Sequence, residues 1–150
     1  GKVSKIASDG IALDDNPLKI LLVEDDIVDA MTVKRALKEI NITNKLHIVN
    51  NGEEALDFLK DPENQTPGII LLDLNMPRMN GIDFLKIAKQ DDTIKRIPVI
   101  VLTTSKEDQD KVDSFNLGVS GYMIKPVDYK KFVEVVKTID LYWTLSELPD

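Results

Sequence analysis

The chain has 150 residues, 43% of them hydrophobic, which is enough for one globular domain with a buried core. Its formal net charge of −7, without any basic stripe, argues against nucleic-acid binding. Cysteine is absent, which excludes disulfides and thiolate metal sites, and with neither a signal peptide nor an apolar run near the ~20 residues of a membrane span we expect a cytoplasmic protein.

Residues 1–16 show no sustained hydrophobic period, so we expect a tail or arm there, followed by a single domain over residues 17–150. The domain alternates strand and helix patterns. Apolar strands are expected at Ile20–Val23, Leu46–Val49, Ile69–Leu72, Val99–Leu102 and Tyr122–Ile124. Apolar residues at helical spacing follow each strand, and the last such segment begins at Asp128 and carries Phe132, Val136, Ile139 and Trp143.

Five strand–helix units, three of them with strands that are apolar throughout, predict an α/β fold with a parallel sheet covered by helices on both faces. Ligands of such sheets bind beyond the carboxyl ends of the strands. The residues that follow each strand are therefore the candidates for a functional site.

Acidic residues follow two of these strands. Glu24 and Asp25 follow the first strand, and Asp73 follows the third. Converging carboxylates repel one another unless a cation binds them, and an all-oxygen, water-exposed site suits Mg²⁺. We expect Asp25 and Asp73 as direct ligands, Glu24 beside them, and the backbone carbonyl of Asn75 as a further ligand. The alternative is that Glu24–Asp26 form only a solvated cap of the first helix.

Thr103 and Lys125 follow the fourth and fifth strands, and their side chains suit the binding of phosphoryl oxygens. These residues share one rim of the sheet, the edge formed by the carboxyl ends of its strands. On this rim, Asp73 is placed to act as a nucleophile and form an aspartyl phosphate. Taken singly, Thr103 is equally well explained as a strand end and Lys125 as a surface charge. Their position on one rim with several acids favours the chemical interpretation.

The chain resembles the receiver domain of two-component response regulators over about residues 18–140. The resemblance lies in Glu24-Asp25, in DLNMPRMNG from Asp73, in LTTS with Thr103, and in GYMIKP with Lys125. It implies a flavodoxin-like fold with strand order 2-1-3-4-5 and five helices. It also implies that a histidine kinase or phosphotransfer protein phosphorylates Asp73, that Thr103 and Tyr122 switch, and that Lys125 clamps the phosphoryl group.

The segment YWTLSELP, together with LDLNMPRMNG upstream, resembles stand-alone regulators paired with bacterial phytochrome-type kinases. The chain left after the last expected strand has no room for an output domain, so we expect signalling by contact with a downstream protein. Tyr142, Trp143, Leu145 and Leu148 add large apolar groups near the last helix. A homodimer through the face of helix four, strand five and helix five is therefore expected, the alternative being a tail folded over its own domain.

Two other functions are alternatives to this signalling module, which we do not expect to be a dedicated enzyme. An aspartate-nucleophile phosphohydrolase carries a second aspartate two residues after the first, but here that position is Asn75, which cannot transfer a proton. A flavodoxin-type nucleotide site is disfavoured because Glu24–Asp26 would repel phosphate. His47, the single histidine, lies on an expected edge strand away from the rim.

Overall fold

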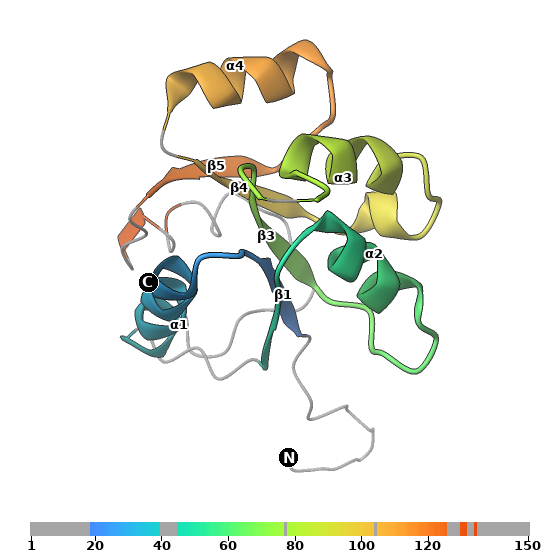
Figure 1. Ribbon diagram of the computed structural model, residues 1–150, viewed down its shortest axis with the longest axis horizontal. Coiled ribbons are helices and arrows are strands. Elements are labelled where there is room, and N and C mark those ends of the chain that lie inside the picture. Colours follow the sequence, from blue (N-terminus) through green and yellow to red (C-terminus); the bar gives the residue numbers. More distant parts are fainter. Residues whose placement is uncertain are drawn as a thin grey trace.

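The computed structural model describes residues 19–39, 45–76, 78–103, 105–125, 130, 131 and 134. Its five strands are β1 (Ile20–Val23), β2 (Leu46–Val49), β3 (Ile69–Asp73), β4 (Val99–Thr103) and β5 (Gly121–Ile124). They form one parallel sheet in the order β2-β1-β3-β4-β5. The helices are α1 (Ile27–Glu39), α2 (Gly52–Lys60), α3 (Gly81–Ala88) and α4 (Lys106–Ser114), with a 3-10 turn η1 (Ile94–Arg96). The predicted strand order is confirmed (Figure 1).

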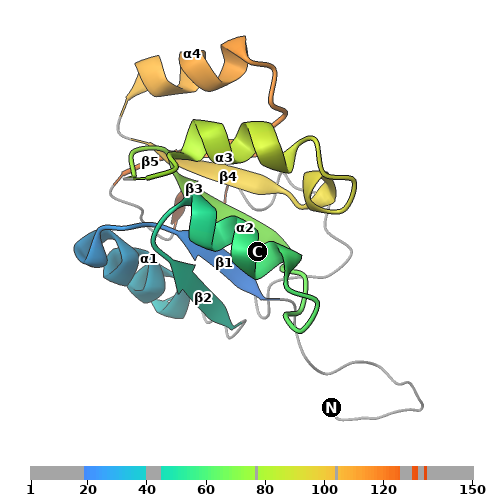
Figure 2. The same cartoon turned by 45° about the vertical axis from the view of Figure 1, so that its right-hand side comes forward.

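Helices cover both faces of the sheet, as the apolar strands predicted. β1 alternates its side chains between two cores: Ile20 and Leu22 pack with the α1 side, while Leu21 and Val23 pack with α2 and α3. Phe84 of α3, fully buried, is the largest of the completely buried side chains in the described chain. Figure 2 shows α2 and α3 on one side of the sheet and α1 on the other.

Polar side chains cap the first turns of α2, α3 and α4 and so fix where the loops at the carboxyl edge end. Asn51 caps α2 by accepting the Glu54 N–H at 2.9 Å, and Asn80 caps α3. Ser105 caps α4 by accepting the Asp108 N–H at 3.1 Å. α4 itself is unusual because Val112 is its one buried residue.

The structure also differs from the expectations. β3 and β4 each run one residue further than predicted, so Asp73 and Thr103 are the last residues of their strands and still pair with neighbouring strands. Four helices are described instead of five. Of the fifth expected helix, 130, 131 and 134 are helical, while its apolar stripe, the C-terminal aromatic segment and the tail at 1–16 lie outside the described residues. None of the described helices is long and apolar enough to span a membrane.

Candidate functional site

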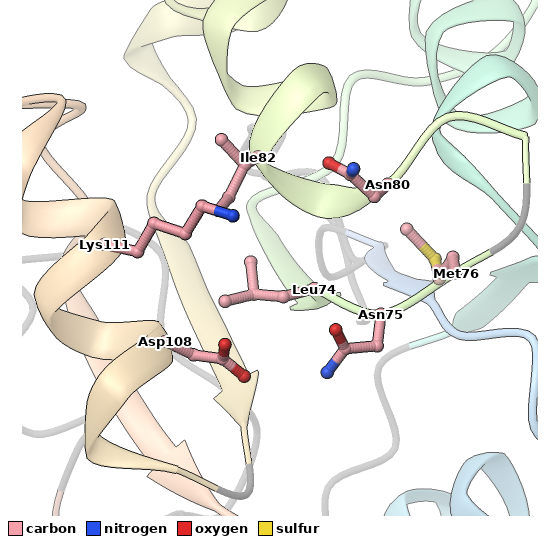
Figure 3. Close-up of a pocket in the computed structure, with 7 residues that line it drawn as sticks. All are labelled: Leu74, Asn75, Met76, Asn80, Ile82, Asp108 and Lys111. Atoms are coloured by element: carbon pink, nitrogen blue, oxygen red, sulfur yellow. The ribbon is translucent and has the colours of Figure 1, made fainter.

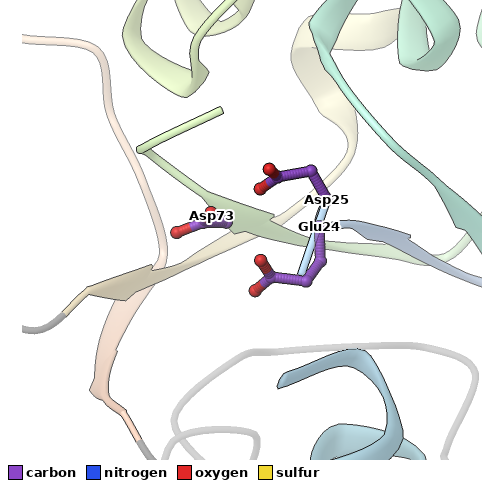
Figure 4. A group of neighbouring side chains, drawn as sticks. All are labelled: Glu24, Asp25 and Asp73. Atoms are coloured by element: carbon purple, nitrogen blue, oxygen red, sulfur yellow. The ribbon is translucent and has the colours of Figure 1, made fainter. Parts of the chain in front are cut away.

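Three carboxylates meet at the carboxyl edge of the sheet. Glu24 and Asp25 follow β1, and Asp73 ends β3, which is the neighbour of β1. Their oxygens lie within 4.8 Å of one another, and Figure 4 shows the three side chains gathered around one point. Glu24 and Asp73 are buried, whereas Asp25 is exposed. The acids predicted as metal ligands are thus brought together.

The buried Glu24 is the strongest sign that this cluster suits a cation. Its Oε2 accepts the Asp26 N–H at 3.2 Å, but its Oε1 is buried without a hydrogen-bond partner. Lys125 Nζ lies 2.8 Å from Oε1 and forms an ion pair with it. Burial raises the pKa of Glu24 to about 7, against the opposing effect of Lys125. A divalent cation with oxygen ligands fits this donor set, as the sequence predicted.

Lys125 lies directly beside Asp73. Its Nζ donates to Asp73 Oδ1 at 3.1 Å, and its side chain is 13% exposed. Burial lowers the pKa of this ammonium, but the neighbouring carboxylates of Glu24, Asp29 and Asp73 outweigh burial and raise it overall. Lys125 therefore carries a fixed positive charge at the end of β5, where the sequence placed it.

Thr103 is buried at the end of β4, but its hydroxyl is directed to α4. The Oγ1 lies 3.0 Å from Asp108 Oδ2 and 3.3 Å from the Ser105 carbonyl, and it accepts the Ser105 N–H at 3.2 Å. A hydroxyl has one hydrogen to donate, and the charged acceptor at the shorter distance is favoured. In this conformation the hydroxyl proton is thus engaged by Asp108 of α4.

The loop after Asp73 is held close to the sheet by a glycine. A Cβ on Gly81 would lie 2.5 Å from the Asp73 carbonyl oxygen and 2.8 Å from Leu74 Cα, so a side chain here would displace backbone. The Gly81 N–H donates to the Leu74 carbonyl at 3.0 Å. Asn75, in this loop, borders the hollow of about 270 Å³ over the acids. Its backbone carbonyl as a metal ligand stays a prediction.

A second hollow, of about 320 Å³, lies on the other side of Asn75 (Figure 3). The loop and the start of α3 form one wall, and α4 forms the other with Asp108 and Lys111. Asn75 therefore stands between the acidic hollow and the space in front of α4.

The Tyr122 hydroxyl is bound to α4 and not to the cluster of Glu24, Asp25 and Asp73. It donates to Asp113 Oδ1 at 2.6 Å and lies 3.3 Å from the Gln109 carbonyl, both on α4. Burial, followed by the hydrogen bond to Asp113, raises the pKa of the phenol. Both residues predicted to switch, Thr103 and Tyr122, are therefore attached to α4.

Sequence reasoning missed two carboxylates that contact site residues. Asp29 of α1 lies 2.9 Å from Lys125 Nζ, and Asp108 of α4 binds Thr103. Both lie within helices, where an acid has no local pattern that distinguishes it from a solvated face. Asp26, by contrast, caps α1 by accepting the Val28 N–H at 2.8 Å. The cap interpretation of the first acidic run was therefore correct for this residue alone.

A five-stranded parallel sheet in this order, with clustered acids and a lysine at its carboxyl edge, defines a receiver module of a signalling system. The chain belongs to the response regulator receiver domain family, whose profile matches residues 20–137. It is 41% identical to the response regulator Rcp1 of Synechocystis sp. over 133 residues, covering 85% of this chain and 90% of that protein. The resemblance to the receiver family is therefore confirmed.

Solved structures agree with this assignment. The bacteriophytochrome response regulator RtBRR superposes with a TM-score of 0.80 at 37% identity, covering 89% of this chain and 84% of that one. The Mn²⁺-bound form of Rcp1 superposes with a TM-score of 0.69 at 37% identity, covering 89% and 100%. Receiver domains are signalling modules, so the chain is not assigned as a dedicated enzyme.

Proposed function

We propose that this receiver is a phosphorylation-activated switch in which Asp73 accepts the phosphoryl group. The observation that carries the proposal is the position of the Asp73 carboxylate. It stands between two acids that complete a cation site and the Lys125 ammonium at 3.1 Å. The domain proposed to perform this function spans residues 17–150, after an N-terminal tail at 1–16.

The donor proposed is a phosphohistidine of a sensor kinase or of a phosphotransfer protein. An Asp73 oxygen attacks phosphorus, the P–N bond breaks, and the leaving imidazole nitrogen keeps the electron pair and takes a proton from solvent. Lys125 offsets the negative charge that develops on the phosphoryl oxygens. Thr103 donates to one of these oxygens after leaving Asp108.

Mg²⁺ is the cofactor we propose, held by Glu24, Asp25, Asp73 and the Asn75 carbonyl. When bound, it would supply positive charge to the phosphoryl oxygens without needing a proton. The buried carboxylate of Glu24, close to those of Asp25 and Asp73, supports this assignment. The relative solved with Mn²⁺ supports it independently.

For partners, we propose a phytochrome-type kinase upstream, because RtBRR is named a bacteriophytochrome response regulator. Downstream, the attachment of Thr103 and Tyr122 to α4 favours the α4–β5 face as the output surface. It would contact a target protein or a second copy of this chain. The part of that face formed by a fifth helix lies outside the described residues.

Intact mass spectrometry tests the function directly. Wild-type protein incubated with acetyl phosphate and Mg²⁺ should gain the mass of one phosphoryl group, while Asp73→Asn or added chelator should prevent the gain. Asp25→Ala should abolish Mg²⁺ binding, and Lys125→Ala should keep the metal but weaken phosphorylation. A phosphoryl adduct that persists in Asp73→Asn would overturn the proposal. Rapid turnover of diverse phosphate esters would favour the phosphohydrolase alternative.

A further inference from the structure

Asp29, in the first turn of α1, is a fourth carboxylate at the acidic edge. Its Oδ2 lies 2.9 Å from Lys125 Nζ, across 96 residues of sequence. We propose that Asp29 is a positioning residue that holds the Lys125 ammonium against Asp73 for phosphoryl transfer, an inference that rests on the function proposed above.

The contacts of Lys125 explain why three acids are needed to position it. An ammonium has three N–H donors. Three carboxylate oxygens lie around this one, from Glu24 at 2.8 Å, Asp29 at 2.9 Å and Asp73 at 3.1 Å. A lysine has a long, flexible stem, so fixing its head in one place needs partners on more than one side. Asp29 supplies the contact from α1, while the other two partners come from the strand ends.

Asp29 differs from these other partners because it lies outside the cation cluster. The carboxylates that converge within 4.8 Å in the described part of the chain are those of Glu24, Asp25 and Asp73. A divalent cation bound by Glu24 and Asp73 would offset part of the attraction of these two carboxylates for Lys125. Asp29 retains its own charge and keeps the ammonium at the site. Its role is therefore greatest in the metal-bound state in which transfer takes place.

The alternative role for Asp29 is a generic one. An acid in the first turn of a helix stabilises the helix through the macrodipole, and its charge adds to the negative potential of the rim. Asp26 provides a matched control, because it also borders the acidic hollow but has no contact with Lys125 among the described interactions. Asp26→Asn makes the same change of charge, and asparagine is an equally good helix cap.

The first experiment measures the rate of phosphorylation by acetyl phosphate at saturating Mg²⁺. We expect Asp29→Asn to slow it about fivefold and Asp26→Asn by less than about twofold, the range for a coupled, partly exposed pair. Asp29→Glu should restore most of the rate, because a carboxylate still reaches the ammonium. In a Lys125→Met background, Asp29→Asn should slow the remaining phosphorylation by less than about twofold.

The second experiment is independent of phosphorylation. Side-chain NMR relaxation of Lys125 in the unphosphorylated protein should show a more mobile head group in Asp29→Asn than in wild type or Asp26→Asn. Equal rates in the two asparagine variants, a full effect without Lys125, or an unchanged Lys125 mobility would each overturn the positioning role. A wild-type protein that takes no phosphoryl group, but whose Lys125 is released by Asp29→Asn, would instead overturn the proposed function alone.

Discussion

Removing the Asp108 carboxylate is expected to favour the activated conformation. Thr103 is 1% exposed and its hydroxyl is bound to Asp108 Oδ2 at 3.0 Å, so it would have to give up this bond in order to turn to a phosphoryl oxygen as proposed. Asp108→Ala deletes the acceptor but keeps the backbone N–H that Ser105 caps. The variant therefore changes the hydrogen bond without removing the helix start.

The size of the effect follows from the surroundings of this bond. A hydrogen bond to a carboxylate contributes more than a neutral one, but Asp108 is partly exposed and water replaces the lost partner. We take a net contribution of about 1 kcal/mol, which is a factor of about five in an equilibrium between two conformations. The apparent affinity for a phosphoryl mimic should tighten by that factor, because a larger fraction of the protein has a free Thr103.

Calorimetric titration with beryllium fluoride and Mg²⁺ measures this affinity. Asp110→Ala is the matched control, because it removes the same charge from α4. The Asp110 carboxylate pairs with Lys106 and has no described contact with Thr103. In a Thr103→Ala background, Asp108→Ala should bring no gain. An unchanged or weaker affinity in Asp108→Ala, or an equal gain in Asp110→Ala, would refute the reasoning.

Two further predictions concern pH and packing. The pKa of His47 is lowered by partial burial and then by Lys19, so the folded state binds fewer protons than the unfolded state as pH falls below 6.5. The contribution of His47 to stability should therefore decrease over that range, while Glu24, whose pKa is raised to about 7, contributes with the opposite sign. NMR of His47 should give a midpoint below 6.5, and Lys19→Gln should raise this midpoint. Gly81→Ala should cost about 1–3 kcal/mol in urea unfolding because its Cβ would meet backbone near Asp73. Gly52→Ala should cost less, since only a flexible side chain opposes it, and equal losses would contradict this reasoning.

The sheet and its rim could be predicted because each rests on a local pattern. A fully apolar strand that ends in Asp73 indicates both a buried strand and a polar edge. In a parallel sheet, the carboxyl ends of all strands lie at one edge. The placement of Glu24, Asp25 and Lys125 near Asp73 therefore follows from their positions directly after strands. Figure 4 shows this convergence for the acids.

The direction of individual side chains could not be predicted in the same way. Asp29 and Asp108 reach the site because of how α1 and α4 are rotated on the sheet, which depends on packing across the whole domain. The exact strand ends were also missed, since Asp73 and Thr103 remain paired although their side chains are polar. Thr103 ends β4, close to where the apolar run predicted, but its bond to Asp108 has no signature in the sequence.

The sparse apolar contact of α4 has a consequence for how the domain moves. Val112 is the one residue that α4 buries, while Asp108 and Asp113 attach it through hydrogen bonds to Thr103 and Tyr122. Shifting such a helix exchanges polar partners for water and opens little of the core, so local excursions cost far less than global unfolding. Amide hydrogens of α4 should accordingly exchange with solvent sooner than those of α3, which buries Phe84 and Leu85.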